Sequence, residues 1–227
     1  MDKLLEEMFK SERWEKAIAT AVDKNMPYNE LENYCSPVFL GKLYKLIRDN
    51  EYNIIPPDQQ SIPKDDGGVR IVYINENVDR KILSIINDML FEFCPTLISE
   101  RSKAYQTNLS CGKVVREVVS RIDSCKLQTI GIKADLSKYF DSVPLRFIEE
   151  VFDKVESIVG KSAVVNLLRR YYECDLCLNE KGEVIEHFQS LKQGCAVASF
   201  LANAVLYEMD EEIKQLDVYY VRYSDTT

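Results

Sequence analysis

Two segments of the sequence each place an aspartate where a cation could reach it. In residues 133–141, KADLSKYFD, Asp135 follows an apolar run that is typical of a buried strand. In residues 220–226, YVRYSDT, a β-rich stretch ends in a polar turn that bears Asp225. Each segment alone also has an ordinary explanation, because aspartate often caps a helix and any strand can end in a polar turn. The only histidine is His187, so the sequence favours chemistry that relies on carboxylates.

A third segment, residues 193–203 with the sequence QGCAVASFLAN, has the features of a close-contact surface. Gly194 allows another group to approach the backbone closely, because glycine has no Cβ atom. Small residues at positions 195, 196, 198 and 199 leave one face of the expected helix flat. Taken alone, this pattern is also explained by close helix packing.

The seven cysteines do not form a recognisable metal or redox site. Only Cys174 and Cys177 make a C-x-x-C pair, and the sequence has no second pair to complete a tetrahedral zinc site. His187 lies ten residues downstream in a segment expected to be a polar hairpin. Buried or partly exposed free thiols are therefore favoured over a metal or redox role.

The three polar segments must be positioned by helices and strands, and the hydrophobic pattern predicts both. Apolar residues at helical spacing indicate helices within residues 1–50 and over 36–48, 79–93, 111–122, 144–155, 162–172 and 196–216. Two hairpins are expected, one pairing 61–64 with 69–74 across Asp-Asp-Gly-Gly and one pairing 176–178 with 184–188. Further strands are expected at 128–133 and 218–223, shortly before Asp135 and Asp225.

Composition limits the classes of function. The chain has 227 residues, 46% of them apolar, so it can bury a substantial core. Its net charge of −8 excludes a generally basic protein that coats nucleic acid, although a local basic channel remains compatible. Residues 61–130 carry 10 basic and 9 acidic groups and form the only third that is not acidic, so an anionic ligand is expected there. The sequence has no apolar run long enough for a membrane span and no signal peptide at its start, which predicts a cytoplasmic protein without membrane partners.

In this order and spacing, the three polar segments resemble the signature of reverse transcriptases. D-x-x-x-x-F-D at 135–141 is similar to their motif A, and Q-G with its small-residue helix at 193–203 is similar to motif B. Tyr-Ser-Asp at 223–225 resembles the start of motif C, which is normally Y-x-D-D. Upstream, IPKDDGGVR at 62–70 resembles the family's fingers hairpin. The resemblance covers about residue 55 to the end.

The resemblance implies an α/β (α+β) fold of the right-hand polymerase type. Residues 1–54 are expected to be an N-terminal helical extension, 55–130 the fingers, and 131–227 an incomplete palm. A mostly antiparallel palm sheet flanked by helices should hold Asp135 and Asp225 at adjacent strand ends. The thumb is expected to be absent.

The resemblance also implies an activity, that of an RNA-directed DNA polymerase. Such an enzyme adds deoxynucleotides from their triphosphates to a DNA primer on an RNA template, and it uses two Mg²⁺ ions, or Mn²⁺ in their place. Asp135 and Asp225 would be the catalytic carboxylates and metal ligands, assisted by the backbone carbonyl of Leu136. Carboxylate and carbonyl oxygens are the hard ligands that Mg²⁺ prefers.

Residues of the fingers and of motif B are implied to bind the nucleotide. Lys64 and Arg70 match the fingers residues that grip the triphosphate, and a guanidinium suits bidentate phosphate contact. Gln193 and Gly194 match residues that line the pocket for the templating base and the new pair. Outside the resemblance, Lys64 and Arg70 are ordinary solvated charges beside a hairpin.

Two further residues receive a role from the resemblance. Phe140 matches the sugar gate, whose ring would clash with a ribose 2′-hydroxyl, although such a residue is otherwise an ordinary core aromatic. Arg80, in the segment VDRKIL, is expected to contact the template backbone.

The sequence departs from the family pattern in ways that bear on activity. Thr226 follows Asp225 where motif C usually has a second aspartate, and Ala198-Ser199-Phe200 stands where motif B usually has Ser-Pro. A threonine hydroxyl is a poor cation ligand beside a carboxylate. We therefore expect this chain to behave as an incomplete and inactive fragment.

Among reverse transcriptases, the hairpin and the motif B helix resemble bacterial enzymes of the group II intron-like or defence-associated classes. The acidic charge favours an anti-phage defence enzyme, because holding a large intron RNA favours a basic surface. Two other interpretations remain open. One is a non-catalytic nucleic-acid-binding protein built on a polymerase palm, and the other is an interaction domain whose motifs are coincidental.

Overall fold

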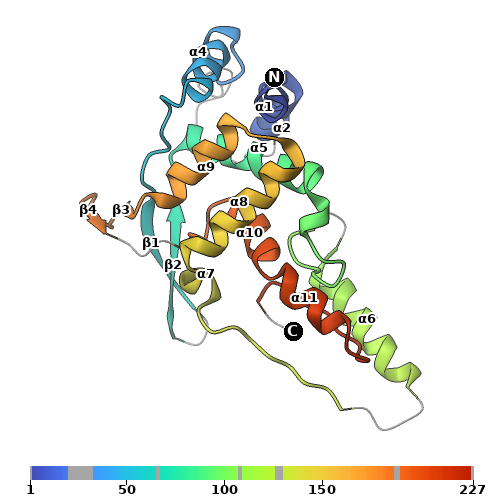
Figure 1. Ribbon diagram of the computed structural model, residues 1–227. Coiled ribbons are helices and arrows are strands. Elements are labelled where there is room, and N and C mark those ends of the chain that lie inside the picture. The colour runs from blue at the N-terminus through green and yellow to red at the C-terminus, as the bar shows by residue number, and fades with distance from the viewer. Residues whose placement is uncertain are drawn as a thin grey trace.

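The computed structural model describes residues 2–19, 33–64, 67–106, 109–125, 130–186 and 190–225. Within these residues, a small sheet lies beside a layer of helices, and the longest helices cross behind and above it (Figure 1). This mixed α/β arrangement, with a sheet flanked by helices, confirms the predicted fold class. Three residues singled out in the sequence, Asp65, His187 and Thr226, lie outside the described residues.

The N-terminal region is helical, as predicted. Helix α1 spans Lys3–Met8, α2 spans Ser11–Ala19 and α4 spans Pro37–Arg48. Ser36 caps the start of helix α4, because its side chain accepts a hydrogen bond from the Phe39 amide, and proline occupies the first turn. Trp14 is completely buried, and its indole nitrogen donates to the Met8 carbonyl at 2.9 Å.

The sheet has four strands in the order β2-β1-β3-β4. Strands β1 (Asp58–Pro63) and β2 (Val69–Ile74) form one antiparallel hairpin, and β3 (Leu176–Leu178) and β4 (Val184–Glu186) form the other. The two hairpins join through parallel pairing of β1 with β3. Both hairpins were predicted, and their pairing joins parts of the chain more than a hundred residues apart.

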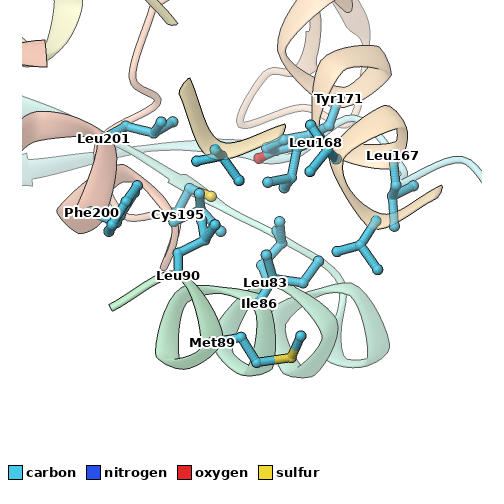
Figure 2. Packing of buried hydrophobic residues seen from close by; sticks show 14 of the residues in the cluster. Leu83, Ile86, Met89, Leu90, Leu167, Leu168, Tyr171, Cys195, Phe200 and Leu201 are labelled. Atoms are coloured by element: carbon cyan, nitrogen blue, oxygen red, sulfur yellow. The ribbon is translucent and has the colours of Figure 1, made fainter. Parts of the chain in front are cut away.

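The core is formed mainly by four helices, α5 (Asn77–Phe93), α8 (Leu145–Val159), α9 (Ala163–Glu173) and α10 (Ala198–Val205). Helix α8 packs against each of the other three, and α5 also packs against α10. Figure 2 shows Leu83, Ile86 and Leu90 of α5 pointing toward apolar side chains of α9 and α10. Each fully buried side chain of this kind contributes roughly 1.5–3 kcal/mol to the free energy of unfolding.

The same core draws residues from every part of the chain. Leu4 and Ile47 of the N-terminal helices, Leu83 of α5 and Leu201 of α10 belong to one cluster of buried residues. The division into an N-terminal extension, fingers and palm, with boundaries at 54 and 130, stays a prediction.

The remaining elements are a 3-10 turn at Pro95–Leu97 and the helices α6 (Cys111–Ser124), α7 (Tyr139–Ser142) and α11 (Tyr207–Lys214). The helix predicted over 196–216 is therefore wrong in one respect, because it begins at Ala198 and breaks at Leu206 into α10 and α11. Asp210, in the second of these helices, has a completely buried side chain.

The predicted palm strands are not formed in the described residues. Residues 130–134 have no regular structure, and Ile130 and Ile132 are 86% and 87% exposed. Residues 218–223 form no strand either, although Arg222 makes an isolated parallel bridge with Ser102. The apolar pattern of both segments is typical of strands. A strand also needs a hydrogen-bonded neighbour along its length, and the spacing of apolar residues does not show whether one is present. Among the described residues, no helix is long and apolar enough to cross a membrane.

Candidate active site

The two predicted catalytic segments lie side by side, even without a palm sheet around them. The amide of Leu136 donates a hydrogen bond to the carbonyl of Asp225 at 3.0 Å, so the backbone after Asp135 runs beside the C-terminal turn. Asp135 is exposed and Asp225 is half-buried. Ser224 adopts a positive φ of 63°, which turns the chain sharply just before Asp225. We call residues 223–225 the carboxylate turn.

The oxygen atoms gathered at this turn suit a divalent cation in chemical type. Asp135 and Asp225 provide carboxylates, and the carbonyl of Leu136 accepts only a long hydrogen bond, 3.3 Å from the Tyr139 amide. Hard oxygen donors of this kind match Mg²⁺ and Mn²⁺. Within the described part of the chain, however, no group of three or more histidine, cysteine, aspartate or glutamate residues is arranged so that it could hold a metal ion. The role of Asp135, Leu136 and Asp225 as metal ligands therefore stays a prediction.

Four of the five residues predicted to bind the nucleotide line one surface cavity of about 580 Å³, and Phe140 does not line it. We call it the hairpin cavity, and it is lined by Ile62, Pro63, Lys64, Arg70, Val72, Gln193 and Gly194. The cavity is therefore lined both by two cations of the β1–β2 hairpin and by the loop before α10. Four of the predicted residues meet here, although the two pairs are more than 120 positions apart in the sequence.

Gly194 has a structural reason to be glycine. Its φ is +106°, and a Cβ atom there would lie 2.8 Å from the carbonyl oxygen of Tyr73 in β2. The neighbouring Gln193 carbonyl accepts a hydrogen bond from the Tyr73 amide at 2.8 Å. The loop is therefore pressed directly against the backbone of β2, and the close approach inferred from the sequence is to a strand.

Lys192, which the sequence analysis did not single out, anchors this loop to the end of α9. Its side chain is completely buried, and its Nζ donates to the carbonyls of Tyr171 at 2.7 Å and Cys174 at 3.1 Å. These carbonyls lie at the C-terminal end of α9, where backbone acceptors lack helical partners. The ammonium group also lies 4.2 Å from the centre of the Tyr171 ring. Burial lowers the pKa of Lys192, and the nearby cysteine thiols counteract part of that effect.

Helix α7 connects the carboxylate turn to the hairpin cavity. At its start, the buried Tyr139 donates to the Ala202 carbonyl at 2.8 Å. Further along, the carbonyl of Phe140 accepts a hydrogen bond from the Leu191 amide at 3.1 Å. Burial raises the pKa of Asp141, whereas the positive charges of Lys138 and Lys64 lower it, so Asp141 lies within electrostatic reach of the cavity.

Phe140 and Arg80 are placed less directly. The Phe140 ring is half-buried, packs against the core and meets the Tyr139 ring edge-on at 5.7 Å, so the structure is compatible with both a core aromatic and a sugar gate. Arg80 is exposed on the first turn of α5, hydrogen-bonds Asn77 and does not line the hairpin cavity. Its contact with a template stays a prediction.

The cysteines form no disulfide, and all seven are free thiols. Cys174 is half-buried and Cys177 is buried, in agreement with the preferred interpretation of the C-x-x-C pair as ordinary thiols. A separate cavity of about 670 Å³ lies between α6 and residues 217–219, and it contains none of the predicted site residues.

Comparisons with known proteins agree with the motifs. Residues 62–227 match the family model described as "Reverse transcriptase (RNA-dependent DNA polymerase)". The chain is 23% identical over 177 residues to "Uncharacterized 91 kDa protein in cob intron" of Schizosaccharomyces pombe, and the match covers 78% of this chain and 21% of that protein. It is 25% identical over 174 residues to "Putative COX1/OXI3 intron 1 protein" of Saccharomyces cerevisiae, covering 76% of this chain and 20% of the relative. The chain thus spans about a fifth of the length of these relatives.

Proposed function

This chain belongs to the reverse transcriptase family, and on that premise we propose that it provides the fingers and part of the palm of an RNA-directed DNA polymerase. The observation that carries the proposal is the hairpin cavity, in which Lys64 and Arg70 face Gln193 and Gly194. The cationic side chains of Lys64 and Arg70 suit the anionic tail of a ligand, and the close-packed Gln193–Gly194 loop suits a flat base. A deoxynucleoside triphosphate has both features.

In the proposed reaction, a primer 3′-hydroxyl attacks the α-phosphate of the bound triphosphate and pyrophosphate leaves. Arg70 and Lys64 hold the phosphates by charge-assisted hydrogen bonds and stabilise the charge that develops on them. Gln193 and Gly194 hold the base end against the wall made by β2. Phe140 excludes a ribose 2′-hydroxyl, and Arg80 contacts the template backbone.

Asp135 and Asp225, with the Leu136 carbonyl, would hold the divalent cations at the carboxylate turn. When bound, such cations lower the pKa of the attacking hydroxyl and offset the charge of the triphosphate. Helix α7 fixes the spacing between the carboxylates and the cavity, because it is bonded to the core at both Tyr139 and Phe140.

For the class of reverse transcriptase, we propose an intron-associated enzyme in preference to a defence enzyme. The names of three relatives, all from yeasts, refer to introns. This favours the group II intron-like alternative of the sequence analysis over the anti-phage alternative that the acidic charge favoured. A basic RNA-binding surface in such proteins need not lie in the segment that this chain matches.

A non-catalytic nucleic-acid-binding protein remains the second candidate, and one observation favours it. Within the described residues, no group of three or more histidine, cysteine, aspartate or glutamate residues could hold a metal ion, so no third such residue joins Asp135 and Asp225. Two adjacent dications repel each other, and fewer carboxylates offset less of that repulsion. This candidate predicts binding of RNA without metal-dependent binding of a triphosphate.

Arg70→Ala tests the proposed function directly. We expect the affinity of the chain for a fluorescent deoxynucleoside triphosphate, in the presence of Mn²⁺, to fall about tenfold to a hundredfold, because hydrogen bonds to charged groups contribute about 1.5–3 kcal/mol. Affinity for an RNA duplex end should change little. The matched control is Arg48→Ala, which removes an exposed arginine paired with Asp49 on α4. Equal losses of triphosphate and RNA affinity would contradict the assignment.

A further inference from the structure

One ion pair differs from all the others formed within the described residues, because both of its side chains are completely buried. Arg222 and Asp210 have exposed fractions of 0%, and their closest atoms lie 2.6 Å apart. The pair joins α11 to the segment that leads into the carboxylate turn, which runs back along that helix (Figure 1). The proposed reaction assigns it no role.

The pair has the geometry of a fixed, bidentate contact. Arg222 Nε donates to Asp210 Oδ1 at 2.8 Å and Nη2 donates to Oδ2 at 2.6 Å. The Tyr220 hydroxyl also donates to Asp210 Oδ1, at 2.7 Å. Burial alone would lower the pKa of Arg222, but the Asp210 carboxylate outweighs it and raises that pKa, so the guanidinium stays charged.

The third nitrogen of the guanidinium reaches the carboxylate turn itself. Arg222 Nη1 donates to the carbonyl of Ser224 at 2.5 Å. This is the carbonyl of the peptide bond to Asp225, and Ser224 has the positive φ described above. A non-glycine residue in that conformation costs on the order of 1 kcal/mol or more, so the turn needs support from its surroundings.

A second layer of polar contacts fixes the arginine in place. Arg222 Nη1 lies 3.4 Å from Asn203 Oδ1, which also accepts a hydrogen bond from the Ser102 hydroxyl at 2.7 Å. The backbone of Arg222 is bonded on both sides, to the carbonyl of Arg101 at 2.9 Å and to the amide of Lys103 at 2.8 Å. The guanidinium therefore has little freedom to move away from Ser224.

Stability alone does not explain this arrangement. A buried ion pair loses most of its Coulombic gain to desolvation, and well-packed apolar residues of similar volume are often as stabilising or more so. A pair of apolar side chains could not, however, hold the Ser224 carbonyl. Arginine can donate two parallel hydrogen bonds to one carboxylate and a further one to a separate carbonyl, and its planar fork fixes the relative direction of these bonds.

We propose that Arg222 is a positioning residue for Asp225, and that it acts by holding the Ser224 carbonyl while Asp210 fixes its guanidinium. The inference rests on the proposed function in one respect, since the use of Asp225 is to hold a divalent cation. It also predicts a property that needs no cation, namely that the turn stays against the backbone of Leu136.

The test replaces the whole pair with apolar residues in the 227-residue chain, as Asp210→Leu with Arg222→Met. The double variant should fold with a melting temperature close to that of the wild type, because no buried charge is left unpaired. Its Leu136 amide, which donates to Asp225, should exchange with solvent at least about tenfold faster. The Tyr73 amide, which donates to Gln193 in the hairpin cavity, should exchange at the wild-type rate. The affinity for Mn²⁺, titrated by electron paramagnetic resonance, should fall about tenfold.

Arg169→Met is the matched control. Arg169 pairs with Glu149, Asp153 and Glu156 on the far side of α8 and α9, so its loss removes an ion-pair network without touching the turn. Both Leu136 exchange and Mn²⁺ affinity should remain at wild-type values. If the double variant does not fold, Arg222→Lys serves instead, because it keeps the charge and loses the fork, and it should show the same faster exchange at Leu136.

The outcomes separate this inference from the proposed function. Unchanged Leu136 exchange in a folded variant overturns the positioning role, whatever the cation affinity. A second outcome is faster Leu136 exchange in the double variant together with Mn²⁺ binding that neither the double variant nor Asp135→Asn nor Asp225→Asn changes. That outcome supports the positioning role and contradicts the metal site. Loss of Mn²⁺ binding in the aspartate variants together with wild-type binding in the double variant supports the metal site and overturns the inference.

Discussion

The hairpin cavity and the carboxylate turn are held by different kinds of interaction. The cavity is made of backbone packed on backbone, with the Gln193–Gly194 loop bonded to Tyr73 of β2. The turn has no strand ladder around it in the described residues, and a side-chain network through Arg222 holds it. Regular structure supports one half of the candidate site, and a single buried ion pair supports the other.

The two halves also treat buried charge differently. Lys192, below the cavity, has no carboxylate among its hydrogen-bond acceptors and is satisfied by the free carbonyls at the end of α9. Arg222, behind the turn, is paired with a full negative charge on Asp210. Lys192 can lose its proton without leaving a buried charge behind. By contrast, removal of either Arg222 or Asp210 leaves the other as a buried charge without a partner. The turn should therefore be the more fragile half.

The largest expected effect is that of Arg222→Met alone. It leaves Asp210 buried without its partner, and breaking a buried pair in this way costs about 3–5 kcal/mol in the free energy of unfolding. Urea denaturation followed by circular dichroism measures the loss. The added Asp210→Leu change should restore most of the stability, and a double variant no more stable than Arg222→Met would show that the charge is not the cause.

Gly194→Ala should have the next largest effect, and it acts on the cavity. The new Cβ would lie 2.8 Å from the Tyr73 carbonyl at a φ of +106°, so clash and backbone strain together should cost about 2–3 kcal/mol. Triphosphate binding should be lost with it. Gly182→Ala is the control, because Gly182 also has a positive φ of +77° but has nothing within 4 Å of a Cβ, so it should cost only about 1 kcal/mol. Equal losses in the two variants would remove the argument for close packing at Gly194.

Lys192→Met should lower the free energy of unfolding by a smaller amount, about 1–2 kcal/mol. The change leaves the carbonyls of Tyr171 and Cys174 without this donor, but it also removes the unfavourable burial of an ammonium group. Thermal unfolding at neutral pH measures the change. Triphosphate affinity should fall a few-fold because the loop above loses its anchor. A more stable variant with unchanged affinity would indicate that burying the ammonium outweighs its hydrogen bonds.

The same residue predicts a pH dependence. Because the pKa of Lys192 is lowered in the folded chain, the unfolded chain binds more protons at pH values between the lowered pKa and about 10.4, the ordinary value for lysine. Stability should therefore rise with pH through that window, relative to Lys192→Met. Denaturation of both proteins at several alkaline pH values tests the sign, and a relative fall in wild-type stability would contradict it.

The smallest expected effect concerns Thr226, which lies outside the described residues, so this prediction rests on the sequence alone. Thr226→Asp would add a third carboxylate next to Asp225 in the sequence, and a unit charge about 8 Å from a divalent cation in water contributes roughly 1 kcal/mol. Mn²⁺ affinity should rise about fivefold by calorimetry. Thr226→Asn, which has similar size and no charge, is the control, and an equal rise in both variants would exclude an electrostatic cause.

Much of the fold could be read from local sequence. The helices at 36–48, 79–93, 111–122 and 162–172 were predicted within a few residues of their observed ends, and Ser36 and Ser162 cap two of them. Both hairpins were predicted from short β-rich runs. The predicted strands at 128–133 and 218–223 are not formed in the described residues, because a strand depends on a partner elsewhere in the chain. The long helix at 196–216 was wrong because periodicity continues through the break at Leu206.

The sequence by itself predicted which side chains could do chemistry, since the motifs that resemble those of reverse transcriptases single out Asp135, Asp225, Arg70 and the Gln193–Gly194 pair. The tertiary structure alone decided what supports them. Nothing near Lys192 or Arg222 in the sequence marks either as buried, because both partners, the end of α9 and Asp210, are brought there by folding. Spacing along a chain reports helices and turns, whereas burial and charge pairing depend on distances in space.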